Sequence, residues 1–187
     1  MNIDTSVLIA IVVAAVVVIA IVGWALTRRR HSAHLKEQFG PEYDRMVRET
    51  GTARQAEAAL ENRERRVAQY HIRPLSPEDS GRYAERWRRV QARFVDDPRG
   101  AVSDADQLIG EVMQSKGYPM TDFEDRAADL SVEHADVVDH YRIAHAIARR
   151  HARGEASTED LRQAMQHYRS LFDELIEVAE PRSTRRA

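Results

Sequence analysis

Four arginines in one short stretch have the types and spacing to bind an anionic partner. Arg82, Arg86, Arg89 and Arg93 recur every three or four residues, which places them along one face of a helix. A guanidinium donates several hydrogen bonds in a fork that matches phosphate and carboxylate groups. The stripe is therefore a candidate contact for an acidic partner or an anionic surface. The alternative is an exposed face that the acidic segment 104–139 screens, within one chain or between two chains.

Other patterns that carry chemistry are sparse. The sequence has no cysteine, no glycine-rich phosphate loop, no G-x-S-x-G motif and no H-E-x-x-H motif. Asp136 and His140 are four residues apart, as two metal ligands on one helix face would be, but a solvated or locally paired histidine has the same spacing. Asp129, Glu133 and Asp136 could supply a general-acid pair. Every amphipathic helix carries such carboxylates, so the sequence assigns no catalytic residue, no metal ligand and no cofactor.

The arginine stripe belongs to a helix predicted over residues 77–95. Ser76 is a good N-cap and Pro77 suits the first helical position, because its missing N–H has no partner there in any case. An apolar stripe runs beside the arginines and includes three aromatic rings, which favours burial of this face in a core. Its members are Tyr83, Trp87, Val90 and Phe94.

Helical periodicity continues after this stretch. Asp97 begins a predicted helix that ends at Gly117, where glycine suits a C-cap. A T-x-x-E capping box at residues 121–124 is expected to open a short helix. Ser131 is then expected to cap a helix over residues 132–151.

The last predicted helix covers residues 158–179, with Ser157 at its cap. The soluble part shows no alternating run of β-branched residues, and its loops are short. These patterns predict an all-α fold, in which an antiparallel helical bundle occupies residues 76–179. Residues 180–187 are expected to form a disordered tail.

Residues 7–26 form an uncharged run of twenty amino acids. As a helix this run would measure roughly 30 Å, which matches the hydrocarbon thickness of a bilayer. It is longer than the core of a signal peptide, its head lacks Lys and Arg, and no small-x-small cleavage site follows it. Residues 1–27 are therefore predicted to be a short tail and one uncleaved transmembrane helix.

The flank of this run predicts its orientation. Trp24 is expected at the level of the lipid headgroups, and Arg28, Arg29 and Arg30 are expected to stay on the cytoplasmic side. The prediction is a single-pass protein of a bacterial cytoplasmic membrane, with its N-terminus outside and its bundle in the cytoplasm. The alternative is an exported bundle on the same anchor.

A basic helical linker is predicted between the anchor and the bundle, over residues 28–75. Gly40 breaks its first helix before Pro41, and residues 41–72 form either one long helix or two halves that meet at Gly51. Apolar residues recur every seven positions in this segment, which would suit a dimeric coiled-coil stalk. The alternative is a helix that lies on its own domain or is largely exposed. The repeating residues are Met46, Ala53, Leu60 and Val67.

Charge is strongly segregated along the chain. Residues 28–95 carry 16 basic and 10 acidic side chains, a net charge of +6, whereas residues 96–139 carry 3 basic and 12 acidic side chains, a net charge of −9. A basic segment beside the anchor suits an anionic leaflet, where each such residue contributes about 1 kcal/mol. Because the bundle as a whole is not basic, nucleic-acid binding is not expected.

Several stretches resemble an uncharacterised group of bacterial proteins that are described as hypothetical, membrane or secreted proteins. The resemblance covers most of residues 34–176 and implies no activity, ligand or catalytic residue. It rests on FGPEYDR at 39–45, RPLSPED at 73–79 with the following W and VQARFVDDP at 90–98, DFEDRAADLSVEH at 122–134 and TEDLRQAMQHYRSLF at 158–172.

The function that these features favour is a non-enzymatic, membrane-tethered helical module that binds a protein partner or a second copy of itself. One alternative is a bundle enzyme that depends on a small ligand or a metal and uses the acidic and histidine residues of segment 120–151. The other is a sensor of anionic lipid that acts through residues 28–30 and the arginine stripe.

Overall fold

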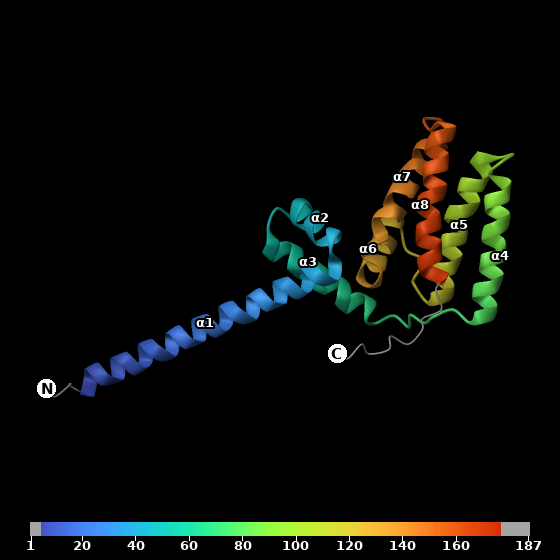
Figure 1. The fold of residues 1–187 in the computed structure, drawn as a ribbon. Helices are drawn as coiled ribbons and strands as arrows, with labels where there is room; N and C mark the ends of the chain where they lie inside the picture. The colour runs from blue at the N-terminus through green and yellow to red at the C-terminus, as the bar shows by residue number, and fades with distance from the viewer. Residues whose placement is uncertain (1–4, 177–187) are drawn as a thin grey trace, which may run out of the picture. The chain divides into compact units, whose positions relative to one another are not determined.

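The computed structural model of the chain describes residues 5–176, and their regular structure is helical throughout (Figure 1). No residue in this range forms a β-strand, which confirms the all-α prediction. Residues 1–4 and 177–187 lie outside the described residues, as do the side chains of residues 5–13, 17, 24–26 and 28. The predicted tail at 180–187 is thus outside the described part.

The chain divides into two compact units, Met1–Glu57 and Ala58–Ala187. This division follows packing, whereas the predicted domain limits after residues 27 and 75 followed composition and loop signals. Those limits stay predictions.

The first unit contains α1 (Thr5–Phe39), α2 (Pro41–Thr50) and the start of α3 (Ala53–Val67). Gly40, with φ of 45°, separates α1 from α2, and Gly51, with φ of 80°, ends α2. Positive φ values favour glycine because it lacks a Cβ. Two helices thus occupy residues 41–67, as the alternative with a break at Gly51 predicts.

A buried carboxylate ties these three helices together. Glu57 of α3 accepts a hydrogen bond of 2.6 Å from the Ser32 hydroxyl of α1 and one of 3.1 Å from the Tyr43 hydroxyl of α2. Burial and this carboxylate raise the pKa of Tyr43. Leu35 and Phe39 on the last turns of α1 are fully buried, so the end of α1 has a packed apolar side as well.

Among the described residues, no helix is long and apolar enough to cross a membrane. Most side chains of the predicted span at 7–26 lie outside the described ones. The side chains of Trp24 and Arg28 also lie outside them. The side chains of α1 that are described between residues 14 and 22 are all exposed.

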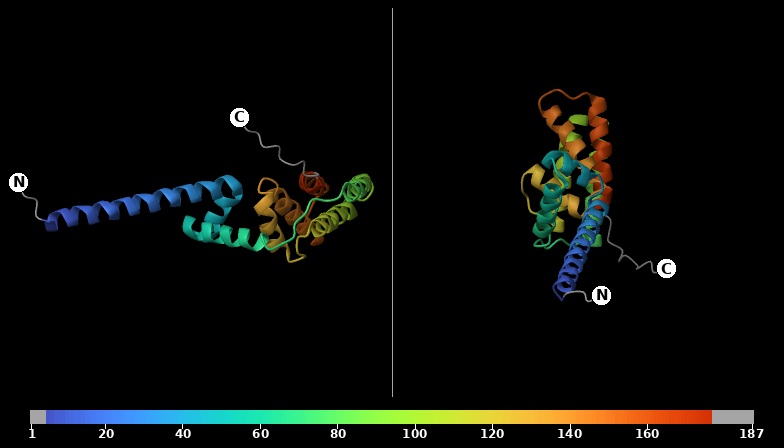
Figure 2. Two further views of the ribbon diagram at one scale, coloured as in Figure 1. Left: turned by 90° about the horizontal axis from the view of Figure 1, so that it is seen from below. Right: turned by 90° about the vertical axis from the view of Figure 1, so that its left-hand side faces the viewer.

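The second unit holds the rest of α3 and five further helices. They are α4 (Pro77–Arg93), α5 (Pro98–Lys116), α6 (Phe123–Glu133), α7 (Val138–Ala152) and α8 (Thr158–Ile176). α8 contacts α7 on one side and α5 on the other, and α4 lies beside α5 (Figures 1 and 2). Four long helices and the short α6 therefore form the bundle, in the order that the sequence predicts.

Side-chain caps begin most of these helices. Ser76 accepts a hydrogen bond from the Asp79 N–H at 3.0 Å, which confirms the predicted cap, and Asp97 caps α5 by accepting from the Gly100 N–H at 2.9 Å. The predicted capping box at 121–124 is wrong by one residue. Asp122, not Thr121, caps α6 by accepting from the Asp125 N–H at 3.0 Å.

The prediction that Ser131 starts a new helix is also wrong. Ser131 lies inside α6 and is fully buried, and its hydroxyl donates to the Ala128 carbonyl at 2.6 Å. That hydroxyl also accepts a hydrogen bond of 2.8 Å from Arg63 of α3. α7 begins at Val138 after a turn, since Ser131 uses its side chain for these two bonds and not for a cap.

Three of the four residues of the sevenfold repeat, Met46, Leu60 and Val67, are buried within one chain, whereas Ala53 is exposed. Leu60 is fully buried and Val67 is nearly so. On the same helix, Arg66 donates to Asp129 of α6 at 2.8 Å through Nε and at 2.5 Å through a terminal nitrogen. These contacts agree with the alternative in which this segment lies on its own domain.

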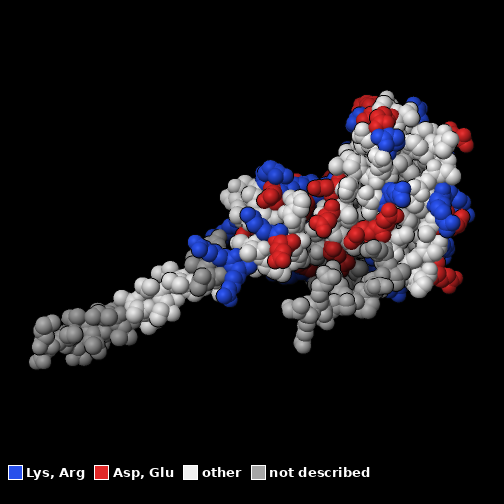
Figure 3. Space-filling view, viewed as in Figure 1, with Lys and Arg blue, Asp and Glu red and all other residues white. Residues whose placement is uncertain are grey.

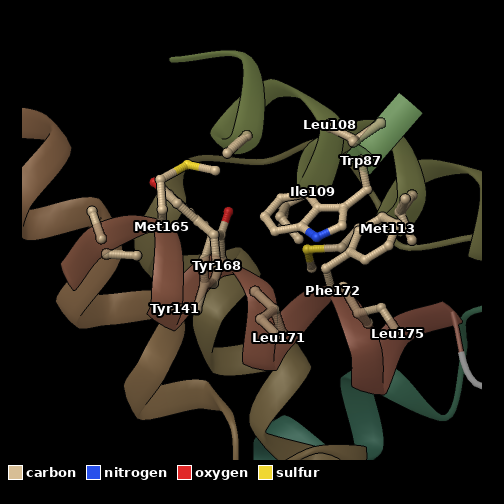
Figure 4. Packing of buried hydrophobic residues seen from close by; sticks show 14 of the residues in the cluster. Trp87, Leu108, Ile109, Met113, Tyr141, Met165, Tyr168, Leu171, Phe172 and Leu175 are labelled. Carbon is tan, nitrogen blue, oxygen red and sulfur yellow. The ribbon is translucent and has the colours of Figure 1, made fainter. Parts of the chain in front are cut away.

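The core of the second unit forms around α8 (Figure 4). Trp87 of α4 stacks on Phe172 of α8, with ring centroids 4.7 Å apart and ring planes 14° apart. An offset aromatic stack adds about 0.5–1.5 kcal/mol to the burial of the two rings. The buried stripe of α8 comprises Leu161, Ala164, Met165, Tyr168, Leu171, Phe172 and Leu175.

Candidate functional site

The predicted arginine stripe lies on α4, where part of it faces α5. Arg86 pairs with Glu111 of α5, and Arg93 pairs with Asp104 of α5 at 2.6 Å. The Glu111 carboxylate raises the pKa of Arg86, and Arg86 in turn lowers the pKa of Glu111. Carboxylates of the acidic segment thus screen these two arginines within one chain.

The other two arginines of the stripe differ from each other. Arg82 is 62% exposed and pairs at 2.7 Å with Asp79, three residues earlier on the same helix. Arg89 is exposed, and it forms no ion pair with any residue in the described part of the chain. The structure therefore keeps the four arginines on one helix but leaves only Arg89 without a carboxylate.

The predicted membrane-interface residues lie on α1. Arg29 and Arg30 are exposed, whereas the side chains of Trp24 and Arg28 are outside the described ones. Figure 3 shows basic side chains where α1 leaves its uncharged stretch. An exposed basic cluster directly after an apolar run is the arrangement that an anionic headgroup layer attracts.

A polar network that the sequence did not single out lies between α5, α6, α7 and α8. Tyr168 of α8 donates to Asp106 of α5 at 2.8 Å, and Nδ1 of His145 on α7 lies 3.7 Å from the same carboxylate oxygen. Phe123 of α6 stacks on the His145 ring at a centroid distance of 3.7 Å. We call Asp106, Arg126, Tyr141, His145 and Tyr168 the Asp106 network.

Opposing effects set the charge of Asp106. Burial raises its pKa, but the facing groups of His145, Tyr168 and Arg126 outweigh burial, so the pKa falls below its usual value of 3.8. Burial raises the pKa of Tyr141 to about 12 and that of Tyr168 further still. At neutral pH the network therefore holds an ionised carboxylate between neutral phenols.

The sequence does contain a signal for this network. Asp106 falls at helical spacing between Val102 and Ile109, so it interrupts the apolar face of its helix, and His145 does the same after Tyr141. A charged or titratable residue on a buried face needs a polar partner. The partner of Asp106 lies 62 residues later in the chain, which sequence spacing does not reveal.

The predicted pair of Asp136 and His140 is not formed on one helix. Asp136 lies in the turn before α7, whereas His140 lies on α7 and faces His167 of α8, with their Nδ1 atoms 2.7 Å apart. Burial and the neighbouring His140 lower the pKa of His167. The two Nδ1 atoms are within hydrogen-bond distance of each other, so the two rings form a local pair between α7 and α8.

The three carboxylates that were candidates for a general-acid pair are not in contact with one another through a shared partner. Each has its own partner or lies in a different part of the unit. Asp129 is bound by Arg66 and also accepts from Tyr70 at 3.0 Å, and Glu133 accepts from Tyr118 at 2.9 Å. Asp136 lies in the turn before α7. A shared proton between two carboxylates requires them to be in contact, and these pairings do not provide it.

The described side chains show no recognisable catalytic constellation and no metal-binding constellation of three residues or more. The Asp106 network contains no serine, threonine or cysteine nucleophile, and Phe123 covers one face of its histidine. Within the described part, no group of three potential metal ligands comes together. Compared with known proteins, the chain matches no protein-family model, no curated protein and no solved structure.

The pH dependence of stability tests the Asp106 network. Asp106→Asn is expected to lower the free energy of unfolding by about 1–2 kcal/mol at pH 7, because Tyr168 loses a charged acceptor and His145 loses a neighbouring carboxylate. Because folding depresses the pKa of Asp106, its contribution is present above about pH 4 and is lost as the pH falls through the folded-state pKa. The difference between wild type and variant should therefore shrink between pH 5 and pH 3, roughly the range over which such a carboxyl titrates.

Urea unfolding of the full chain in neutral-detergent micelles, followed by circular dichroism, measures this difference. Asp173→Asn on α8 is the matched control, because the Asp173 side chain is 58% exposed and pairs only with Arg169. A gap that is absent at pH 7, or that stays constant down to pH 3, would contradict the proposed charge of Asp106.

Proposed function

We propose that the chain is a single-pass membrane protein that displays a helical module for binding another protein or a second copy of itself. The observation that carries the membrane part is the exposure of large apolar side chains on α1. Val16, Val18, Ile19, Ile21 and Val22 are each 50–70% exposed. Because these positions are almost consecutive, they point to all sides of the helix, and no side of it is reserved for protein packing.

Water is a poor environment for such a surface. Burying one valine or isoleucine side chain contributes about 1.5–3 kcal/mol, so leaving five of them exposed is costly. Lipid hydrocarbon removes this cost, while the helix satisfies its own backbone hydrogen bonds. The uncharged run at 7–26 has the length that lipid requires, and Arg29 and Arg30 follow it as exposed charges.

The binding part of the proposal rests on the character of the bundle. Several of its buried polar groups, such as Asp129 and Tyr168, have partners inside the chain, and the described residues bring no group of three potential metal ligands together. A rigid helical module on an anchor serves to position a surface rather than to transform a substrate. We place this module in the cytoplasm, since the basic cluster follows the anchor.

Charges introduced into the apolar run test the anchor. The triple substitution Val16→Asp, Ile19→Asp and Val22→Asp is expected to release the chain from the membrane, because each central charge costs about 2.5–3.5 kcal/mol on insertion scales. The measurement is alkaline carbonate extraction of cell membranes. Wild type should stay in the pellet, and so should the control Val95→Asp, whose native side chain is 82% exposed on the second unit. Complete extraction of the wild-type protein would contradict the proposed membrane anchor.

Orientation is tested separately with a C-terminal tag. Protease added to intact spheroplasts should leave the tag uncut, and cutting should begin only after detergent treatment. Replacing Arg28, Arg29 and Arg30 with Glu removes the basic bias and should increase the fraction that is cut. A tag that is cut in intact wild-type spheroplasts would favour the exported alternative.

Association is tested on residues 32–187. Light scattering and cross-linking in lysate should give either a dimer or a defined heteromeric band, as a binding module requires. A fragment that stays strictly monomeric and cross-links to nothing would weigh against this function, while leaving the anchor untouched.

A further inference from the structure

Two histidines from neighbouring helices of the bundle bring ring nitrogens together. His140 of α7 and His167 of α8 have their Nδ1 atoms 2.7 Å apart, and their ring centroids are 5.0 Å apart. An imidazole nitrogen is a metal ligand as well as a hydrogen-bonding group. Two such nitrogens, held on two different helices within reach of one ion, are therefore a candidate metal site.

The separation of the two nitrogens is close to that of two ligands on one ion. A bond from a metal to an imidazole nitrogen measures about 2.0–2.1 Å, so two adjacent ligands are about 2.9 Å apart in a square-planar site and about 3.3 Å apart in a tetrahedral one. The hydrogen-bonded rings are slightly closer than this, at 2.7 Å. Small rotations of the two side chains, which move the nitrogens apart by less than about 1 Å, would admit an ion.

The packing of α7 against α8 holds the two histidines in place. Tyr141 and Tyr168, which follow them directly in the sequence, are both fully buried and fix the rotation of each helix about its own axis. Ala144 and Ala164 lie one helical turn away and are also fully buried, so no bulky side chain separates the helices there. Ligands on packed helices are positioned more precisely than ligands on loops.

Neither histidine is occupied by a carboxylate. His134 and His145 of the same unit each lie against an acidic side chain, whereas His140 and His167 pair with no acidic residue in the part of the chain that the structure describes. Both side chains are partly exposed, so solvent can reach them. Burial and the neighbouring His140 lower the pKa of His167, which favours the neutral ring that a metal requires.

We propose that His140 and His167 bind one divalent transition-metal ion, which bridges α7 and α8 and completes its coordination with water. Imidazole nitrogen suits Zn²⁺, Ni²⁺ and Cu²⁺, whereas Mg²⁺ and Ca²⁺ prefer oxygen ligands. No third histidine or carboxylate joins the pair among the described residues, so the site is open and differs from a closed structural zinc site. The proposal is independent of the membrane anchor, because every residue that carries it lies on α7 and α8.

The test is zinc binding by the full chain, prepared without a histidine tag, in neutral-detergent micelles at pH 7. Isothermal titration calorimetry should give one ion per chain, and zinc chloride should raise the melting temperature relative to a chelator, since the ion binds the folded state. Magnesium chloride should do neither. His140→Gln and His167→Gln should each weaken the affinity for zinc by about tenfold or more, because glutamine keeps a hydrogen-bonding group but supplies no imidazole.

His151→Gln is the matched control. It removes a partly exposed histidine from the last turn of α7, and it should change the affinity for zinc by less than about twofold. Four outcomes would overturn the proposal. They are no saturable zinc binding by the wild type, an equal loss with His151→Gln, unchanged binding in the double variant of His140→Gln and His167→Gln, and one ion shared by two chains.

A second measurement uses the wild-type chain alone and so requires no variant to fold. Long-range proton–nitrogen correlation spectra report the state of each imidazole nitrogen. When zinc is added, the Nδ1 resonances of His140 and His167 should shift together, and those of His151 should stay in place. Shifts confined to other histidines would contradict the site.

Discussion

The apolar stripe of α8 is the constraint on which the second unit depends. Its buried side chains meet α5, α7 and α4, and the stack of Trp87 on Phe172 joins the outermost of these helices to it. Tyr168 lies in the same stripe, yet its hydroxyl reaches Asp106. Apolar packing of α8 therefore places the Tyr168 hydroxyl next to Asp106 of α5. Any shift of α8 along its axis would separate this pair as well as the rings.

Buried polar groups decide which helices can meet, since each needs a partner that only one neighbour supplies. Asp129 on α6 accepts from Arg66 and Tyr70, which holds the end of α3 and the following turn to α6. Lys116 on α5 donates to the Leu175 carbonyl at 3.3 Å, although burial lowers its pKa. An ion or donor without its partner would cost several kcal/mol in the interior. Such pairs select one arrangement from the many that apolar stripes alone permit.

The sequence was informative where the physics is local. Caps depend on residues three positions apart, so the Ser76 cap could be predicted, and helical stripes such as that of Trp87 follow from periodicity. Prediction from the sequence failed where a side chain bonds a residue far away in the chain and not the nearby backbone. Ser131 resembles a cap, but it is buried and bound by Arg63, 68 residues away. The Asp106 network was not predicted for the same reason, because no residue near Asp106 in the sequence indicates that Tyr168 is its partner.

In the folded second unit, many of the segregated charges lie against charges of opposite sign. The basic helix α4 lies against acidic α5, and Arg66 lies against Asp129, so much of the contrast between the +6 and −9 segments is used within one unit. Bulk charge therefore gives a partner little to recognise on α4. What remains is local, namely the exposed Arg29 and Arg30 after the apolar run, and Arg89, which pairs with no described carboxylate. The proposed binding of a partner would then depend on the shape and spacing of single sites, because exposed, solvent-screened ion pairs contribute little on their own.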